Sequence, residues 1–202
     1  HDTFSRYLAP QVIEELIKHP DTIALGGRKA NLSILFSDIR GFTTLSESMT
    51  PERLTSFLNR YLTHMTDIIL DQNGVVDKYI GDAVMAFWGA PLPDENAAYN
   101  ACVSALEMQD RLDKLQSKIR KYGDIEIRQR VGLNTGVCIV GNMGSESKFN
   151  YTAMGDPVNL ASRLEGTNKQ YGTGILISEF THRLVSKKVL TREVDRVQVV
   201  GK

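Results

Sequence analysis

Residues 75–88 read VVDKYIGDAVMAFW, two apolar runs on either side of Gly81 and Asp82. A Gly-X pair between runs rich in β-branched and aromatic residues is typical of a tight β-hairpin. We therefore expect strands over Val75–Tyr79 and Ala83–Trp88. This hairpin places the carboxylate of Asp82 on its turn.

The segments around this hairpin predict a further strand and two long helices. In residues 31–38 apolar and polar residues alternate, which indicates a strand that ends on the carboxylate of Asp38. Residues 50–74 begin with Thr-Pro, continue with apolar residues at spacings of three and four, and end with Asn-Gly, which predicts a helix. Residues 98–119 repeat the helical spacing.

The remaining residues continue the alternation of strands and helices. Residues 125–134 and 137–140 predict a second hairpin around Thr135 and Gly136, followed by a loop over 141–155. The other expected elements are a helix from Asp156 to about Glu165, a strand over 175–178, a helix over 179–185 and a strand over 194–200. The complete order is β-α-β-β-α-β with a β-α-β-α-β extension. It predicts an α+β fold with a ferredoxin-like core and antiparallel pairing.

The composition is that of a soluble globular domain. The 202 residues carry 24 Lys and Arg against 24 Asp and Glu, so the formal net charge is zero. Nucleic-acid-binding proteins usually carry a basic excess, and a helix that spans a bilayer needs about 20 predominantly apolar residues. The sequence has neither feature, so we expect no nucleic-acid partner and no membrane contact by this segment.

Other features indicate the context of the domain. Apolar residues recur at helical spacing over 4–18, so we assign 1–27 to a helical connector and 28–202 to the functional domain. The chain starts at His1 and ends inside a predicted strand, from which we expect a piece of a longer, multidomain protein.

Cys102 and Cys138 lie in apolar surroundings, without the spacing of metal ligands. We therefore expect buried reduced thiols and a cytoplasmic location.

Two aspartates are the first candidates for chemistry, since the sequence has no P-loop, dinucleotide-binding or zinc-protease motif. If the strands that carry Asp38 and Asp82 are neighbours, the two carboxylates meet at one edge of the sheet. Hard oxygen ligands suit Mg²⁺, and paired ions can activate an attacking oxygen beside a phosphate. The alternative is that Asp82 is only a turn residue and Asp38 only a cap.

Asn159 and Arg163 are the second candidates. They are four residues apart in a predicted helix and therefore share one face. An amide beside a guanidinium suits a ribose and a phosphate whose negative charge grows in the transition state. The alternative is an ordinary solvated helix face.

Four stretches, taken in order, resemble the signatures of class III adenylyl and guanylyl cyclases. They are residues 36–43 (FSDIRGFT), 77–87 (DKYIGDAVMAF), 130–136 (RVGLNTG) and 151–163 (YTAMGDPVNLASR). The resemblance extends from about Arg28 to Lys202 and implies the nucleotide cyclase fold. It implies the conversion of ATP to 3′,5′-cyclic AMP and pyrophosphate with two divalent metal ions, Mg²⁺ and in the second site Mg²⁺, Mn²⁺ or Ca²⁺.

The resemblance also assigns roles to individual residues. It makes Asp38, Asp82 and the main-chain carbonyl of Ile39 metal ligands, and it places Phe42 and Thr43 in a loop against the nucleotide. Asn159 is expected to orient the ribose and Arg163 to stabilise the α-phosphate. Lys148 and Lys202 stand at positions where members of this family contact the triphosphate.

The positions that read the base are Lys78 and Thr152. Adenylyl cyclases commonly carry Lys and Asp there, and guanylyl cyclases Glu and Cys, so the threonine is a departure. Its hydroxyl can accept a hydrogen bond from the adenine amino group or donate one to a ring nitrogen. The Lys/Thr pair resembles a subgroup with mammalian soluble and cyanobacterial cyclases, many stimulated by bicarbonate, and we expect bicarbonate as an activator.

Because all these roles occur in one chain, the resemblance implies a head-to-tail homodimer with two active sites shared between protomers. Three alternatives remain: a guanylyl cyclase, a catalytically silent nucleotide-binding or dimerisation module, and a diguanylate cyclase or polymerase-type transferase. The last requires a Gly-Gly-[Asp/Glu]-Glu-Phe turn, which Tyr79–Ala83 lacks.

Overall fold

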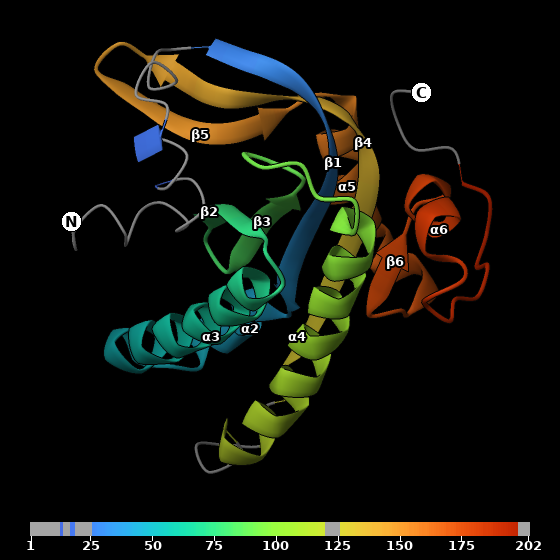
Figure 1. Ribbon diagram of the computed structural model, residues 1–202. Helices are drawn as coiled ribbons and strands as arrows, with labels where there is room; N and C mark the ends of the chain where they lie inside the picture. The colour runs from blue at the N-terminus through green and yellow to red at the C-terminus, as the bar shows by residue number, and fades with distance from the viewer. Residues whose placement is uncertain (1–12, 14–16, 19–25, 120–125, 198–202) are drawn as a thin grey trace.

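The computed structural model describes residues 13, 17–18, 26–119 and 126–197 (Figure 1). Most of the expected connector helix over 4–18 lies outside these residues, as does Lys202. The elements in chain order are β1 (Gly26–Arg40), α2 (Phe42–Glu47), α3 (Pro51–Asp71), β2 (Val75–Ile80), β3 (Ala83–Trp88), α4 (Ala97–Ile119), β4 (Arg128–Ser145), β5 (Lys148–Met154), α5 (Asp156–Tyr171), β6 (Ile175–Ile177) and α6 (Glu179–Val185). Among the described helices, none has the length and apolar character that a membrane span requires.

The sheet has the predicted ferredoxin-like topology. Its strand order is β2-β3-β1-β4-β5, with β6 added in parallel to β4. The long strand β1 lies between β3 and β4 and is antiparallel to both. The predicted β2–β3 hairpin is confirmed, with Gly81 and Asp82 between the strands and Gly81 at φ 64°.

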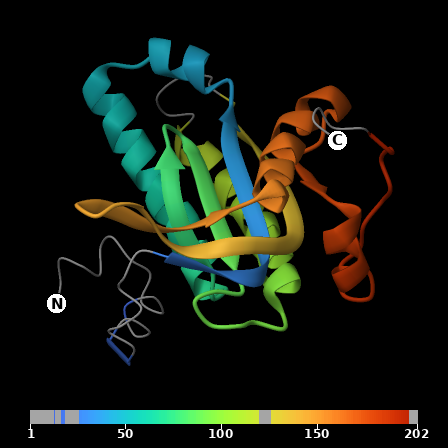
Figure 2. The same ribbon diagram turned by 90° about the horizontal axis from the view of Figure 1, so that it is seen from above.

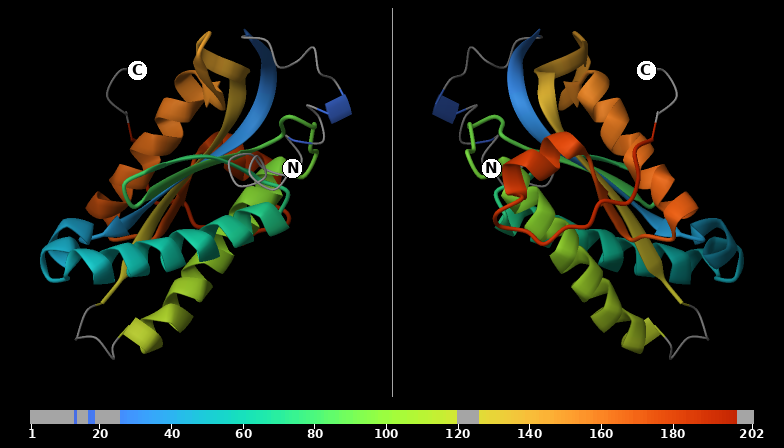
Figure 3. Two further views of the ribbon diagram at one scale, coloured as in Figure 1. Left: turned by 90° about the vertical axis from the view of Figure 1, so that its left-hand side faces the viewer. Right: turned by 90° about the vertical axis from the view of Figure 1, so that its right-hand side faces the viewer.

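Helices cover both faces of this sheet. In Figure 3, α3 and α4 lie on one side and α5 on the other. The first cluster of buried side chains includes Leu35, Met65 and Met108, and the second includes Leu32, Cys138 and Ala161. The side chains of alternate β1 residues thus point into opposite clusters, as expected for a strand in a sheet with helices on both faces.

The sequence-based predictions for the long helices are confirmed. Thr50 is the N-cap of α3, where its hydroxyl oxygen accepts a hydrogen bond from the Arg53 amide.

Both cysteines are buried and free, and burial raises the pKa of each thiol to about 11.

The prediction of a hairpin around residues 135–136 is wrong. Strand β4 is continuous from Arg128 to Ser145. Gly136 serves close packing rather than a turn, because a Cβ atom there would lie 2.7 Å from the Pro157 side chain of α5. Gly132 has the same function, since its Cβ would lie 2.2 Å from the Glu165 amide nitrogen. The two glycines let α5 lie directly on the strand.

Three further predictions are corrected. Most of residues 141–155, expected as a loop, forms the end of β4 and all of β5, paired from Ile139↔Met154 to Ser145↔Lys148. Phe42 and Thr43, expected in a loop, begin the short helix α2. Residues 194–197 form no strand, and the rest of the predicted final strand lies outside the described residues.

Candidate functional site

The carboxylates of Asp38 and Asp82 meet at one edge of the sheet. Asp38 lies near the end of β1, and Asp82 lies on the turn after β2, next to the start of β3, which pairs with β1. The main-chain N–H of Ile39 donates a hydrogen bond to Asp82 Oδ2 at 3.0 Å. Burial, and then contact with the Asp38 carboxyl, raise the pKa of Asp82 to about 7. The predicted meeting of these two aspartates is therefore confirmed.

The Asp38–Asp82 pair suits Mg²⁺, which needs few protein ligands, better than a metal ion that is coordinated entirely by protein side chains. Within the described residues, no group of three or more His, Cys, Asp and Glu side chains forms a metal site. Mg²⁺ is commonly held by one or two carboxylates together with water and substrate phosphates. Two carboxylates in contact, one with a raised pKa, provide the negative charge that such an ion neutralises.

Arg130 connects Asp38 to helix α5. It stands directly opposite Asp38 in the β1–β4 register, and its Nη2 lies 3.4 Å from Asp38 Oδ2. Its Nε lies 3.0 Å from Glu165 Oε1, and burial raises the pKa of Glu165. Local sequence patterns assign no role to Arg130. Only the pairing of β1 with β4, which join distant parts of the chain, identifies it.

Lys78 and Thr152 come together at a third residue, Asp77. The Thr152 hydroxyl donates a hydrogen bond to Asp77 Oδ2 at 2.5 Å, and the Ala153 amide donates to the same oxygen at 3.2 Å. Lys78 Nζ lies 3.3 Å from Asp77 Oδ1. Figure 2 shows how this occurs, because the β4–β5 hairpin crosses over β2 and β3. The two predicted base-reading side chains thus lie together within one chain.

Helix α5 presents Asn159 and Arg163 from a fixed position. The Asn134 side chain donates to the Pro157 carbonyl at 2.9 Å near the start of the helix. Asn168 donates to the Val131 carbonyl at 2.9 Å near its end. Within the described residues, no hydrogen bond or ion pair involves the Arg163 guanidinium, which leaves it available to a ligand.

The other predicted residues lie apart from these clusters. Phe42, the first residue of α2, is partly buried against the first core cluster, and Thr43 is exposed. Lys148 is exposed at the start of β5, where its amide donates to Ser145 Oγ at 3.1 Å. No contact between described residues joins Lys148 to the aspartates, and Lys202 lies outside the described residues.

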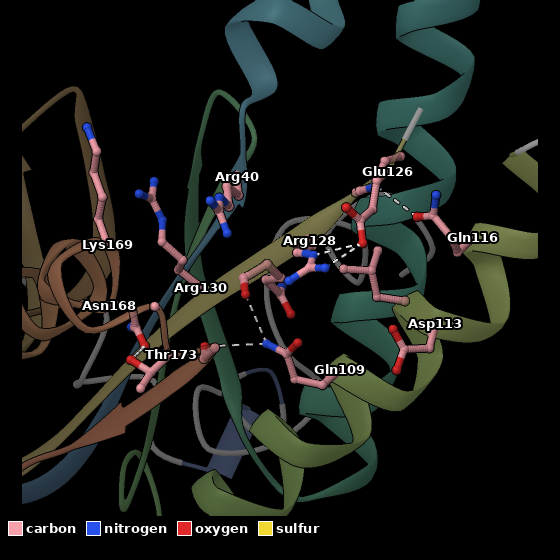
Figure 4. A pocket seen from close by; sticks show the side chains of 15 residues that line it. Arg40, Gln109, Asp113, Gln116, Glu126, Arg128, Arg130, Asn168, Lys169 and Thr173 are labelled. Carbon is pink, nitrogen blue, oxygen red and sulfur yellow. Dashed lines mark hydrogen bonds and ion pairs between the residues drawn. The ribbon is translucent and has the colours of Figure 1, made fainter. Parts of the chain in front are cut away.

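None of the predicted site residues lines either of two cavities in the described structure. One cavity, of about 290 Å³, lies beside Arg40, Arg128 and Arg130, and its lining side chains are drawn in Figure 4. Gln109 in this lining donates to two main-chain carbonyls. A larger hollow of about 1050 Å³ lies between α5, α6 and residues 189–197. Apolar side chains on β2, β4 and β5 are exposed, with Ile80 58%, Val137 61% and Met154 56% exposed.

Comparison with known proteins gives consistent matches. Residues 26–202 match the family described as the adenylate and guanylate cyclase catalytic domain. Adenylate cyclase 1 of Rhizobium meliloti is 38% identical over 179 residues, which cover 87% of this chain and 26% of that protein. The chain therefore spans about a quarter of the length of this relative.

Solved structures are similar over most of the chain. The adenylyl cyclase CyaB from P. aeruginosa has a TM-score of 0.83 and 38% identity, covering 88% of this chain and 91% of that one. The guanylyl cyclase Cya2 has a TM-score of 0.81 and 34% identity, covering 88% and 89%. Similar backbones thus occur in cyclases named for different bases.

Proposed function

Since the chain belongs to the adenylate and guanylate cyclase catalytic domain family, we propose that it converts ATP to 3′,5′-cyclic AMP and pyrophosphate. The ribose 3′-oxygen forms a bond to the α-phosphorus, the bond from that phosphorus to the bridging oxygen of pyrophosphate breaks, and the hydroxyl proton is released. The observation that carries the proposal is the contact between Asp38 and Asp82 beside the Ile39 main chain.

Asp38, Asp82 and the Ile39 carbonyl are the proposed ligands of two divalent ions, Mg²⁺ with Mg²⁺, Mn²⁺ or Ca²⁺ in the second site. Such ions lower the pKa of a bound hydroxyl and stabilise charge on the phosphate. Arg130 forms ion pairs with Asp38 and with Glu165 of α5, and so links this proposed ligand to the helix. It thereby fixes the orientation of one ligand.

Residues of α5 and α2, together with two lysines, are assigned to bind the ribose and the phosphates. We assign Asn159 to the ribose, and Arg163 to the α-phosphate, where a guanidinium stabilises the charge that develops in the transition state. Phe42 and Thr43 contact the nucleotide from α2, and Lys148 and Lys202 contact the triphosphate. The side chain of Arg163 has no ion pair among the described residues that would compete with this role.

Adenine is the proposed base. The Lys78 ammonium has only donors, which suits the unprotonated N1 of adenine and not the N1–H of guanine. The similarity to Cya2 keeps GTP as the second candidate substrate.

The active unit is proposed to be a homodimer with two shared sites. Apolar side chains on β4 and β5 are exposed, including Val137 and Met154. Ile139 pairs with Met154 on the same face of the β4–β5 hairpin and is 38% exposed. Exposed apolar side chains gathered in this way commonly mark a protein interface.

Bicarbonate activation is proposed on the Lys78/Thr152 pair alone. Cyclase activity is measured at fixed pH and ionic strength with sodium bicarbonate against sodium chloride. A rate increase that saturates with bicarbonate supports the proposal, and equal rates in the two salts contradict it.

The experiment that tests the main proposal is product identification by chromatography, with ATP and GTP separately, each with Mg²⁺ or Mn²⁺. We expect cyclic AMP from ATP at a higher kcat/KM than cyclic GMP from GTP. Preference for GTP would establish the guanylyl cyclase alternative. Nucleotide binding without any cyclic product would establish the silent module. The Asp38→Ala variant controls for contaminating activity.

A further inference from the structure

Asp77 occupies an irregular position in β2. The β2–β3 pairing joins Val76 to Ala86 and Lys78 to Met85, so Asp77 is an extra residue without a partner in β3. A β-bulge of this kind changes the direction of a side chain and is often found beside active sites. Here the side chain of Asp77 reaches β5, a strand at the opposite end of the sheet order.

The environment of Asp77 is unusual for a carboxylate. Its side chain is fully buried, with an exposed fraction of 0%. A buried carboxylate is stable only when donors surround it. Asp77 has the Thr152 hydroxyl and the Ala153 amide at Oδ2, and the Lys78 ammonium at 3.3 Å from Oδ1. The residue therefore contacts both side chains assigned to the base.

This arrangement fixes the direction of the Thr152 hydroxyl. A threonine hydroxyl has one hydrogen and two lone pairs, so it can serve a ligand as donor or as acceptor. A carboxylate can only accept, so the hydroxyl hydrogen points to Asp77 at 2.5 Å. Thr152 is only 7% exposed, which limits competition from water. Toward a base, its oxygen is then an acceptor only.

A hydrogen-bond acceptor beside a donor distinguishes adenine from guanine and hypoxanthine. Adenine presents an amino group at C6 and an acceptor at N1, whereas guanine and hypoxanthine present a carbonyl at C6 and a donor at N1. With Lys78 facing N1 and Thr152 facing the C6 substituent, the donor and the acceptor match adenine at both atoms and oppose guanine and hypoxanthine at both. A polar group left unpaired in such a site is the usual basis of strong discrimination.

We propose that Asp77 is a positioning residue that sets base choice, by holding the Thr152 hydroxyl as an acceptor and the Lys78 ammonium as a donor for adenine. The inference rests on the proposed nucleotide site. It adds to that proposal a residue that contacts no substrate and yet determines which base is accepted. It also explains how a neutral threonine can replace the aspartate found in many adenylyl cyclases, because the carboxylate lies one layer behind it.

The test compares Asp77→Leu, which removes the acceptor, with Asp110→Asn, which changes an exposed carboxylate on α4 that pairs with Lys114. Values of kcat and KM are measured for ATP and for inosine triphosphate, which carries the guanine-like C6 carbonyl and N1–H. We expect Asp77→Leu to lower the ATP preference about 10- to 100-fold, mainly through KM. Asp110→Asn should leave the preference unchanged.

A second pair of variants, at Thr152, tests the same hydrogen bond if Asp77→Leu fails to fold. Thr152→Val removes the hydroxyl and should lower the preference by a similar factor, whereas Thr152→Ser keeps the hydroxyl and should retain it. Adding Asp77→Leu to Thr152→Val should cause a smaller further loss than Asp77→Leu causes alone. A folded Asp77→Leu with wild-type preference, or fully additive losses, would overturn the inference.

Binding separates this inference from the proposed reaction. The affinities of α,β-methylene ATP and α,β-methylene inosine triphosphate, which keep the base but block pyrophosphate release, are measured by calorimetry for the wild type and Asp77→Leu. A wild type that prefers the adenine ligand but forms no cyclic product would refute the reaction and leave the inference standing if the preference falls in Asp77→Leu. Equal affinity ratios in the two proteins would refute the inference whatever the activity.

Discussion

The Asp82 carboxylate accepts a hydrogen bond from the main-chain N–H of Ile39, at 3.0 Å, and so ties the β2–β3 turn to the end of β1. This bond brings a second carboxyl group against Asp38 and by itself lowers the pKa of Asp82. Burial and the neighbouring carboxyl outweigh it, because the pKa of Asp82 is raised to about 7. The turn is therefore held in a geometry that costs stability when Asp82 is ionised and no cation is bound.

We predict that Asp82→Asn stabilises the metal-free protein while abolishing cyclase activity. The folded pKa is raised above the ordinary value of 3.8 to about 7, so the wild type loses stability as pH rises between these values. The asparagine removes this loss, and its Tm should exceed that of the wild type near neutral pH, with the difference vanishing toward about pH 4. Thermal unfolding in EDTA across this pH range measures it.

The control for this prediction is Asp67→Asn, an exposed carboxylate on α3. It should change neither the pH dependence of Tm nor the activity. Mg²⁺ should raise the Tm of the wild type more than that of Asp82→Asn. A lower Tm for Asp82→Asn at every pH would contradict the raised pKa, and retained turnover would contradict the metal assignment.

Shared active sites predict complementation between two inactive variants. Asp38→Ala removes a metal ligand and Arg163→Ala removes a phosphate contact, so each homodimer should be inactive. In a mixture, a heterodimer has one site with both defects and one site with neither, and activity should return to about a quarter of the wild-type value if protomers exchange at random. Inactivity of the mixture, with heterodimers demonstrated by differently tagged protomers, would argue for sites within one chain.

Arg130→Met should weaken the use of metal. The guanidinium lies between Asp38 and Glu165, and its loss leaves Asp38 less well oriented and Glu165 without its ion pair. We expect the Mg²⁺ concentration for half-maximal activity to rise about 10-fold, the scale seen when groups behind a metal ligand are removed. Arg128→Met is the matched control, because Arg128 is exposed and pairs with Glu126. Equal Mg²⁺ dependence in the two variants would exclude the orienting role.

Local sequence patterns predicted much of the fold and the centre of the site. The Gly81-Asp82 hairpin and the Thr50 N-cap depend on residues a few positions apart, and both are found as expected. The meeting of Asp38 and Asp82 followed from one further assumption, that β1 and β3 are neighbours, which the β-α-β-β-α-β order favours.

The supporting residues depended on information that local patterns lack. Arg130 lies opposite Asp38 on a strand 92 positions away in the sequence, so its role depends on the register of β4. Asp77 acts through a bulge that the alternation of β2 does not reveal. Gly136 resembled a turn residue because glycine is common in turns, whereas here it permits contact with Pro157.

That contact gives the final prediction, a comparison of two glycine-to-alanine changes. Gly136→Ala places a Cβ atom 2.7 Å from the Pro157 side chain, so the start of α5 must move. We expect a loss of about 1–3 kcal/mol in the free energy of unfolding. Because α5 carries Asn159 and Arg163, kcat for ATP should fall as well, with a smaller change in KM.

Gly166→Ala is the matched control in the same helix. Nothing lies within 4 Å of a Cβ atom at this position, and alanine favours helix over glycine by about 0.5–1 kcal/mol. The variant should therefore be at least as stable as the wild type and equally active. Urea unfolding and steady-state kinetics of the two variants measure both effects. If Gly136→Ala retained wild-type stability and kcat, close packing of α5 on β4 would not be what holds the catalytic side chains in place.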